Sequence, residues 1–300
     1  MNDVETMQGG VTRRDFIRGT AAGAVGGLVV GATGTTLASG PTAKPPPGGA
    51  AGRGFYSALS AEIVQMRGHE GDRIEAYLSR PSGPGPYPGV LVIHHMPGWD
   101  EASMEITRKF AHHGYVAICP DLHYREGKGS PEANSASVRN AGGMPDNRTM
   151  GDVEGGIRYL RTLPYLNGKV GIIGYCSGGR QVYLAACTLK GIDAAVNCYG
   201  GGVGAGTVGL TPRQPVDPLD YTQNLGCPLL GLFGREDKRP SPEHVARTEA
   251  ELKKWGKTYA FHTYDHAGHA FFSVDRPSYR PEAAVDGWAK VFQWYEKFLR

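Results

Sequence analysis

Gly174-Tyr175-Cys176-Ser177-Gly178 is the stretch that decides the fold, because it has the spacing of a nucleophile elbow with a cysteine at its centre. In an elbow the nucleophile lies on a strained turn between a strand and a helix. Side chains two residues before or after it would collide with neighbouring backbone. The apolar run 169–174 predicts the strand, and the small-residue run 178–189 predicts the helix. Cys176 would then stand at a helix N-terminus, where the helix dipole favours its thiolate.

Two other interpretations of this stretch compete with a cysteine nucleophile. In the first, Cys176 is an inert, buried cysteine in a glycine-rich turn. In the second, Ser177 is the nucleophile, but an elbow centred on it would place Tyr175 where the first glycine is required. The predicted strand before the turn and the predicted helix after it favour Cys176.

Strands and helices alternate over the rest of the chain, which predicts an α/β fold with a mostly parallel central sheet and helices on both faces. A hairpin is expected first, with strands at 61–67 and 73–79. The later strands are expected at 89–94, 115–119, 169–174, 194–199, 228–233 and 258–263. The helices are expected at 102–113, 149–163, 178–189, 242–255 and 281–299, and Ser241 is the expected N-cap of the fourth. A long loop rich in Gly, Ser and Asn is expected between 119 and 149.

Length, charge and cysteine usage narrow the class of protein. The 300 residues are 40% hydrophobic, which suits one globular domain with a large core better than two small domains. The net charge of +3 and the lack of a long Lys and Arg run argue against nucleic acid as a partner. The five cysteines are an odd number without a C-x-x-C pair, so neither a zinc site nor a disulfide framework is predicted. We expect a monomer.

The N-terminus resembles an export signal. Thr12-Arg13-Arg14-Asp15-Phe16-Ile17-Arg18 matches the twin-arginine pattern, and an apolar Gly- and Ala-rich run follows at 21–37. Small residues before Ala38 predict cleavage after it, giving a signal peptide at 1–38, a linker at 39–56 and a catalytic domain at 57–300. The alternative is an uncleaved anchor, but the run is short and weakly apolar, so no stable membrane span is expected. The sequence therefore predicts the twin-arginine export machinery as a partner and a periplasmic or secreted protein.

A cysteine nucleophile needs a base, and the base needs an acid that orients it. In α/β-hydrolases both follow the nucleophile in the order acid, then histidine, at carboxyl ends of strands. Asp237 directly follows the strand predicted at 228–233, with Glu236 as the fallback acid and Asp265 as a weaker one. His269 is the preferred base in the loop after the last strand, which also holds His266.

The oxyanion that forms during acyl transfer needs backbone N–H donors. One is expected from Ser177, the residue after the nucleophile. The second is expected from the loop after the strand at 89–94, most plausibly from Met96.

With these residues placed, the chain resembles the dienelactone hydrolase (carboxymethylenebutenolidase) family of the α/β-hydrolase superfamily. The matching segments are Gly-Tyr-Cys-Ser-Gly-Gly at 174–179, Cys-Pro-Asp-Leu-His at 119–123, Pro-Tyr-Leu-Asn-Gly-Lys-Val-Gly at 164–171, Asp237 and His-Ala-Phe at 269–271. The resemblance implies an α/β-hydrolase fold and a triad of Cys176, Asp237 and His269. It also implies hydrolysis of the enol-lactone 4-carboxymethylenebut-2-en-4-olide to maleylacetate, without a cofactor.

The chain departs from the family where Gln-Glu typically follows the first core strand, because His94-His95 stands there instead. The family's glutamate contacts the resting thiol. An imidazolium at that place would favour the thiolate, so our hypothesis is that His95 contacts Cys176 and keeps it more ionised. The alternative is that His94 and His95 only shape the loop. A shared metal site is not expected, because adjacent residues on a strand end point to opposite faces.

The family also binds its substrate's carboxylate with arginines, and Arg276 is the candidate for that role here. A second arginine would come from Arg125, Arg139 or Arg148.

The predicted reaction is covalent acyl transfer from a small-molecule ester or lactone through an acyl-thioester. Three alternatives stay open: a broader exported carboxylesterase or thioesterase with the same triad, a non-catalytic binding protein on a hydrolase scaffold, and a redox sensor built on Cys176. The redox sensor lacks an evident resolving cysteine.

Overall fold

The computed structural model describes residues 59–300. The predicted signal peptide at 1–38, the linker at 39–56 and the first two residues of the predicted domain at 57–300 lie outside the described residues. These N-terminal assignments and the cellular location stay predictions. Among the described residues, no helix is long and apolar enough to cross a membrane.

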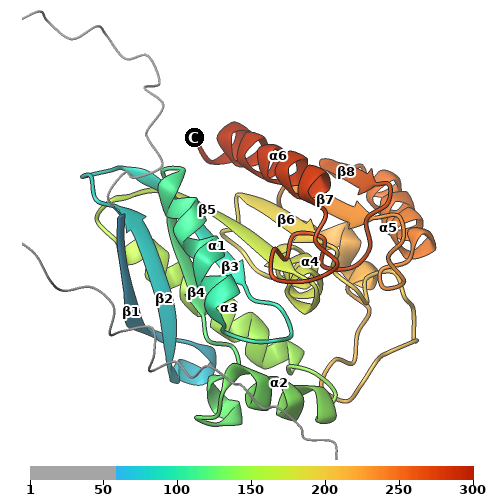
Figure 1. Cartoon of the computed structure of the whole chain (residues 1–300), viewed down its shortest axis with the longest axis horizontal. Helices are drawn as coiled ribbons and strands as arrows, with labels where there is room; N and C mark the ends of the chain where they lie inside the picture. Colours follow the sequence, from blue (N-terminus) through green and yellow to red (C-terminus); the bar gives the residue numbers. More distant parts are fainter. Residues whose placement is uncertain (1–58) are drawn as a thin grey trace, which may run out of the picture. The chain divides into compact units, whose positions relative to one another are not determined.

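An eight-stranded sheet forms the centre of the fold, with the strand order β1-β2-β4-β3-β5-β6-β7-β8 (Figure 1). The strands β4, β3, β5, β6, β7 and β8 run parallel, whereas β1–β2 and β2–β4 pair antiparallel. The bounds of the strands are β1 Leu59–Arg67, β2 Arg73–Pro81, β3 Tyr87–Ile93, β4 Val116–Pro120, β5 Leu166–Tyr175, β6 Ala194–Cys198, β7 Leu229–Gly234 and β8 Tyr259–Tyr264. The predicted hairpin and the mostly parallel sheet are both confirmed.

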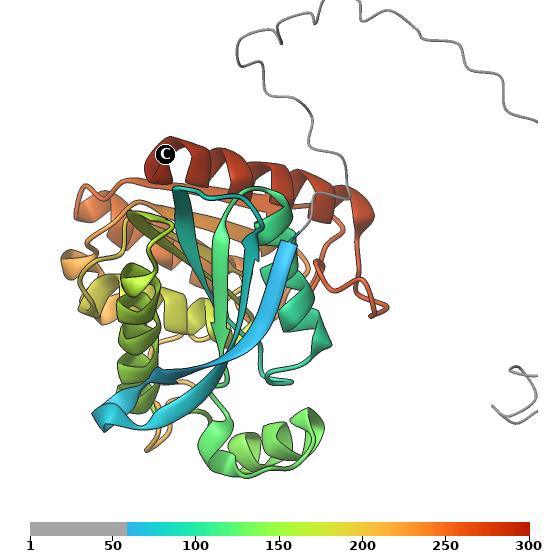
Figure 2. The same cartoon turned by 90° about the vertical axis from the view of Figure 1, so that its left-hand side faces the viewer.

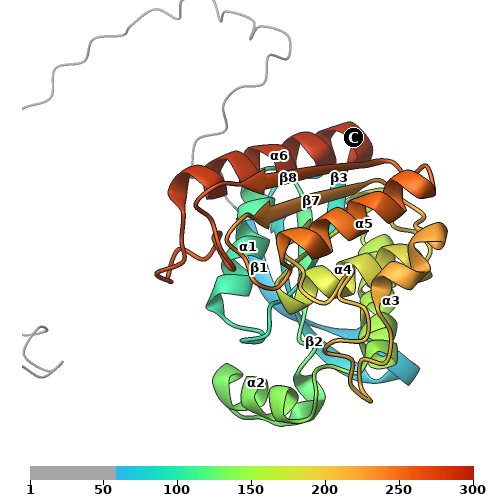
Figure 3. The ribbon, with the colours of Figure 1, turned by 90° about the vertical axis from the view of Figure 1, so that its right-hand side faces the viewer.

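Helices cover both faces of the sheet, as the sequence predicted (Figures 2 and 3). Their bounds are α1 Glu101–His112, α2 Pro131–Asn140, α3 Asp146–Thr162, α4 Ser177–Thr188, α5 Pro242–Lys254 and α6 Pro281–Leu299. One core contains Phe110 of α1 and Tyr295 of α6 on the first face. The other contains Ile157 of α3, Val182 of α4 and Leu252 of α5 on the second face. The strands between the two layers are buried on both sides, which explains their continuous apolar runs.

One helix was missed by the sequence analysis, because α2 lies inside the segment that was expected to be a long loop. Its Ser130 side chain accepts a hydrogen bond from the Ala133 amide, and Pro131 occupies the first turn. Only Ser135 and Val138 of α2 are buried, so the helix lacks the apolar stripe that would have revealed it. In Figure 2, α2 lies apart from the two helical layers, at one end of the sheet.

The parallel strands bring their carboxyl ends to one edge of the sheet. Tyr175 ends β5, Gly234 ends β7 and Tyr264 ends β8, so the loops after these three strands meet there. Ser241 caps α5 as predicted, and its hydroxyl accepts from the His244 amide. This edge is where the candidate site lies.

Candidate active site

Cys176 lies on a strained turn between β5 and α4. Its φ of 56° and ψ of −120° are unusual for a residue that bears a side chain. The two motif glycines allow this turn, because a Cβ on Gly174 would come within 2.3 Å of the Gly178 carbonyl oxygen. A Cβ on Gly178 would likewise come within 2.3 Å of the Ile93 carbonyl oxygen. The elbow geometry expected from the glycine spacing is therefore present.

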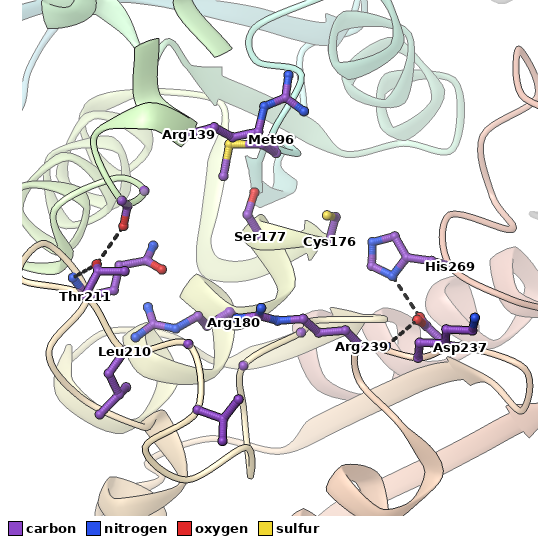
Figure 4. A pocket seen from close by; sticks show the side chains of 18 of the residues that line it. Met96, Arg139, Cys176, Ser177, Arg180, Leu210, Thr211, Asp237, Arg239 and His269 are labelled. Carbon is purple, nitrogen blue, oxygen red and sulfur yellow. Dashed lines mark hydrogen bonds and ion pairs between the residues drawn. The ribbon is translucent and has the colours of Figure 1, made fainter. Parts of the chain in front are cut away.

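The structure brings Cys176, His269 and Asp237 together, although the three lie in separate loops (Figure 4). Nδ1 of His269 lies 2.8 Å from Oδ2 of Asp237, and the Asp237 side chain is only 2% exposed. Oδ1 of Asp237 accepts a second hydrogen bond, of 2.8 Å, from the Arg239 amide. Both carboxylate oxygens of Asp237 are held in this way. The imidazole is therefore oriented so that its second ring nitrogen meets the Cys176 thiol.

The Cys176 thiol and the His269 imidazole shift each other's pKa. Burial raises the pKa of Cys176, but the hydrogen bond and charge of His269, together with the Ser177 and Met96 amides, outweigh burial and lower that pKa below its ordinary value. Burial likewise lowers the pKa of His269, but Asp237 and Cys176 together raise it to about 10. The two shifts act in the same direction, because each partner favours the charged form of the other, thiolate and imidazolium.

The two amides predicted as oxyanion donors both reach the sulfur. The backbone N–H groups of Ser177 and Met96 hydrogen-bond the Cys176 side chain and help to lower its pKa. Ser177 is the first residue of α4, so its N–H is one of the unsatisfied donors of a helix N-terminus. Met96 reaches the same point from the loop after β3. A carbonyl oxygen between these two amides would lie next to the sulfur.

His95 does not take the place that our hypothesis gave it. Its Nε2 lies 2.7 Å from Oδ2 of Asp100, and His95 is not among the groups that shift the pKa of Cys176. Oδ1 of Asp100 accepts from the Ser103 amide at the start of α1, so the carboxylate joins that helix to the Met96 loop. His94 is buried, and its ring nitrogens contact the His95 carbonyl oxygen and the Leu122 amide. Both histidines therefore shape the loop, the alternative that the sequence left open.

The structure places the four candidate arginines in different surroundings. Arg276 is exposed and is not among the residues that line the cavity at Cys176. It lies in a turn after His269, where its amide donates to the Ser273 carbonyl oxygen and its own carbonyl oxygen accepts from the Tyr279 amide. Arg125 is paired with Asp72 and Asp152, and Arg148 is paired with Glu126. Arg139 of α2 lines the cavity, and within residues 59–300 no carboxylate pairs with it.

A cavity of about 770 Å³ opens at Cys176 (Figure 4). Besides the site residues above, the cavity is lined by residues from the segment after α2, from α4, from the glycine-rich loop after β6 and from the loop after β7. These residues are Gly142, Gly143, Arg180, Gly201, Gly202, Val208, Gly209, Leu210, Thr211, Gln214, Glu236, Lys238 and Arg239. The sequence analysis missed Arg239 and this loop, because nothing in a glycine-rich run shows which cavity it will border. In residues 59–300 no group of three or more His, Cys, Asp or Glu side chains is arranged to hold a metal ion.

The pH dependence of Cys176 alkylation separates the influence of Asp237 from that of His95. Because Asp237 stabilises the imidazolium that lowers the pKa of Cys176, we expect Asp237→Asn to shift the iodoacetamide reactivity profile upward by about one pH unit or more. His95→Gln is the matched control and should leave the profile in place, since His95 pairs with Asp100. An upward shift in His95→Gln with none in Asp237→Asn would reverse these two assignments.

The sheet order and the strained strand–cysteine–helix turn define an α/β-hydrolase fold. A sequence profile described as "Dienelactone hydrolase family" matches residues 74–299, and the chain belongs to that family. It is therefore a hydrolase of the lactone and ester class.

Individual relatives agree with this assignment. The chain is 33% identical over 228 residues to the "Putative carboxymethylenebutenolidase" of Methylorubrum extorquens, covering 75% of this chain and 77% of that one. The protein of the same name from Escherichia coli is 32% identical over 236 residues, covering 76% and 84%. A crystal structure of a "Putative Dienelactone Hydrolase" from Klebsiella pneumoniae superposes with a TM-score of 0.73 at 28% identity, covering 80% of this chain and all of that one (100%).

Proposed function

We propose that the protein hydrolyses an activated ester or enol-lactone through a Cys176–His269–Asp237 triad and an acyl-thioester intermediate. The observation that carries this proposal is the contact of the Cys176 thiol with the His269 imidazole, whose other nitrogen lies 2.8 Å from Asp237. Family membership supports the reaction class, and a relative from Bradyrhizobium carries the name "Probable 2-oxo-3-(5-oxofuran-2-ylidene)propanoate lactonase". An enol-ester is a suitable substrate, because its leaving group departs as a resonance-stabilised enolate.

In the first half of the reaction, the Cys176 thiolate attacks the ester carbonyl carbon. The electron pair of the carbonyl bond moves to oxygen, where the N–H groups of Ser177 and Met96 stabilise the negative charge. The carbon–oxygen bond to the leaving group then breaks, and His269 gives its proton to the departing enolate, which leaves the imidazole neutral for the second half. The product of this half-reaction is an acyl-thioester on Cys176.

In the second half, His269 accepts a proton from water and the resulting hydroxide attacks the thioester carbonyl. The collapse of this second oxyanion releases the acid and restores the thiolate. Asp237 keeps the imidazole in one orientation and stabilises its charge throughout. No cofactor is needed in this sequence of steps.

An acidic substrate is supported by two exposed arginines at the cavity. Arg139 and Arg239 both line it, and among residues 59–300 neither guanidinium is paired with a carboxylate. Both are exposed, so each is free to meet a carboxylate that enters from solvent. The second candidate function, a general carboxylesterase or thioesterase, is favoured by the size of the cavity, which exceeds what a small lactone fills.

The experiment that tests the function compares the turnover of dienelactone with that of p-nitrophenyl acetate by the purified protein. Faster turnover of dienelactone would support the lactone activity, and turnover of the simple ester alone would support the general esterase. No turnover of either ester would contradict the proposed function. A higher KM for dienelactone in Arg139→Met, with an unchanged KM for the uncharged p-nitrophenyl acetate, would identify Arg139 as the partner of the substrate carboxylate.

A further inference from the structure

Two guanidinium groups border the cavity on different sides of the sulfur. In Figure 4, Arg139 lies beside Met96 on one side of Cys176, whereas Arg239 lies on the other side, next to Arg180. Arg139 belongs to the last turn of α2, and Arg239 belongs to the loop after β7. Two separate segments therefore bring positive charge to the cavity, with the nucleophile between them.

The glycine-rich loop after β6 makes room for the Arg239 side chain. A Cβ on Gly201 would come within 2.9 Å of Cγ of Arg239. A Cβ on Gly209 would overlap the guanidinium itself, with 3.2 Å to Cζ. The arginine thus extends along glycines that have no side chain to displace it, which places its guanidinium at the cavity.

This loop is held in place by hydrogen bonds. Asp217 is 4% exposed, and it accepts hydrogen bonds of 3.0 Å from the Gly204 amide and 2.7 Å from the Gly206 amide. Farther along, the Thr211 hydroxyl donates a 2.6 Å hydrogen bond to the Gly142 carbonyl oxygen, just after α2. The loop that packs against one arginine is therefore tied to the helix that carries the other.

Outside the triad, the charged side chains that line the cavity leave two positive charges without a partner. Arg180 is neutralised by Asp146, which accepts two hydrogen bonds from its guanidinium. Lys238 is matched by Glu236, which has the opposite sign and lies on the same loop. Among residues 59–300, only the two exposed guanidinium groups described above then remain as unmatched charges at the cavity.

We propose that the substrate is a dianion, an ester or lactone with one carboxylate on its acyl part and one on its alcohol part, each bound by a different arginine. The reacting carbonyl carbon must lie at the sulfur, so groups that reach arginines on different sides of the sulfur belong to different sides of the ester. The inference rests on the proposed function and deepens it, because a substrate with one carboxylate would leave one guanidinium unused.

The carboxylate that hydrolysis creates is not one of these two. It forms from the reacting carbonyl group, next to the sulfur, where the amides of Ser177 and Met96 meet the Cys176 side chain. Both carboxylates of the proposed dianion are therefore present before the reaction begins.

The test compares kcat/KM of the full chain for four esters, built from two acyl groups and two leaving groups. The acyl group is pentanoyl or its acidic analogue glutaryl, and the leaving group is 2-nitrophenol or 4-hydroxy-3-nitrobenzoate. Each guanidinium–carboxylate pair should raise kcat/KM by about tenfold, so the ester with both carboxylates should exceed the uncharged ester by about a hundredfold. If the ester with two carboxylates is no better than the better of the two esters with one, the dianion is overturned.

Arg139→Met and Arg239→Met assign the two carboxylates. Each variant should lose the gain from one carboxylate and keep the gain from the other, and the lost carboxylate should differ between the variants. Arg239→Met keeps the backbone amide that donates to Asp237, so the acid of the triad stays held. Loss of the same gain in both variants would overturn the inference, since both arginines would then bind one carboxylate.

Arg276→Met is the matched control, because it removes the same charge from an exposed arginine that does not border the cavity. It should leave the ratios among the four esters unchanged. An equal fall of these ratios in Arg276→Met would mean that the overall charge of the protein attracts the acidic esters, and it would overturn a site made by the two cavity arginines.

A binding measurement separates failure of this inference from failure of the proposed function. Amide analogues of the four esters, with N–H in place of the ester oxygen, are titrated into Cys176→Ala by calorimetry. The analogue with two carboxylates should bind about tenfold more tightly than either analogue with one. If this difference is found while the esters are not hydrolysed, the proposed function is wrong and the dianion site stands. Equal binding of the charged analogues would overturn the inference by itself.

Discussion

Cys176→Ala should lose about a thousandfold or more of kcat/KM toward whichever ester the protein hydrolyses, and should accumulate no acyl-enzyme. The reason is that the triad acts as a unit, so His269 and Asp237 have no covalent chemistry to assist once the sulfur is gone. Steady-state kinetics measures the loss. Intact-protein mass spectrometry after rapid quenching would show the thioester adduct in the unmodified protein alone.

Two variants make this result specific to the cysteine nucleophile. Cys227 is half-buried like Cys176, but burial raises its pKa to about 12, so Cys227→Ala should keep full activity. Ser177→Ala keeps the backbone N–H that contacts the sulfur and should therefore keep most activity. Equal activity of Cys176→Ala and the unmodified protein would remove the central claim, and loss of activity in Ser177→Ala alone would favour the competing serine.

Asp146→Ala should lower the free energy of unfolding by about 3 to 5 kcal/mol. The carboxylate of Asp146 holds the Arg180 guanidinium with hydrogen bonds of 2.6 and 3.1 Å, and the Arg180 side chain is only 6% exposed. Without Asp146 the buried cation keeps only the Val216 carbonyl oxygen, at 2.7 Å, as a partner. This pair joins the start of α3 to α4, the helix that begins directly after Cys176. Urea unfolding measures the loss.

The control for this prediction lies on the same helix. Glu154 and Arg158 of α3 form a 3.0 Å ion pair, but their side chains are 53% and 57% exposed. Because water screens such a pair, Glu154→Ala should cost no more than about 1 kcal/mol. In the double variant Asp146→Ala with Arg180→Met, stability should recover part of the loss, since the unpaired cation is gone. Equal small losses in Asp146→Ala and Glu154→Ala would contradict the argument.

The sequence alone determined the elements that depend on short-range patterns. The apolar runs predicted β5, β6 and β7 to within a few residues, because strands buried on both faces carry continuous apolar sequence. The G-x-C-x-G spacing predicted the turn at Cys176, since sterics at the two glycines act over two residues. The position of Asp237 and His269 after the ends of strands predicted that they would meet at one sheet edge.

Only the tertiary structure decided which partners the polar side chains choose. The sequence left open whether His95 contacts Cys176 or only shapes the loop, and in the structure it pairs with Asp100, the N-cap residue of α1. Three arginines that follow β4 were equivalent by pattern, but ion pairs occupy Arg125 and Arg148 and leave Arg139 at the cavity. Long-range contacts of this kind leave no periodic trace in the chain. The loop after β6 has the same origin, because hydrogen bonds to Asp217 and to the Gly142 carbonyl oxygen bring a segment without regular structure to the cavity.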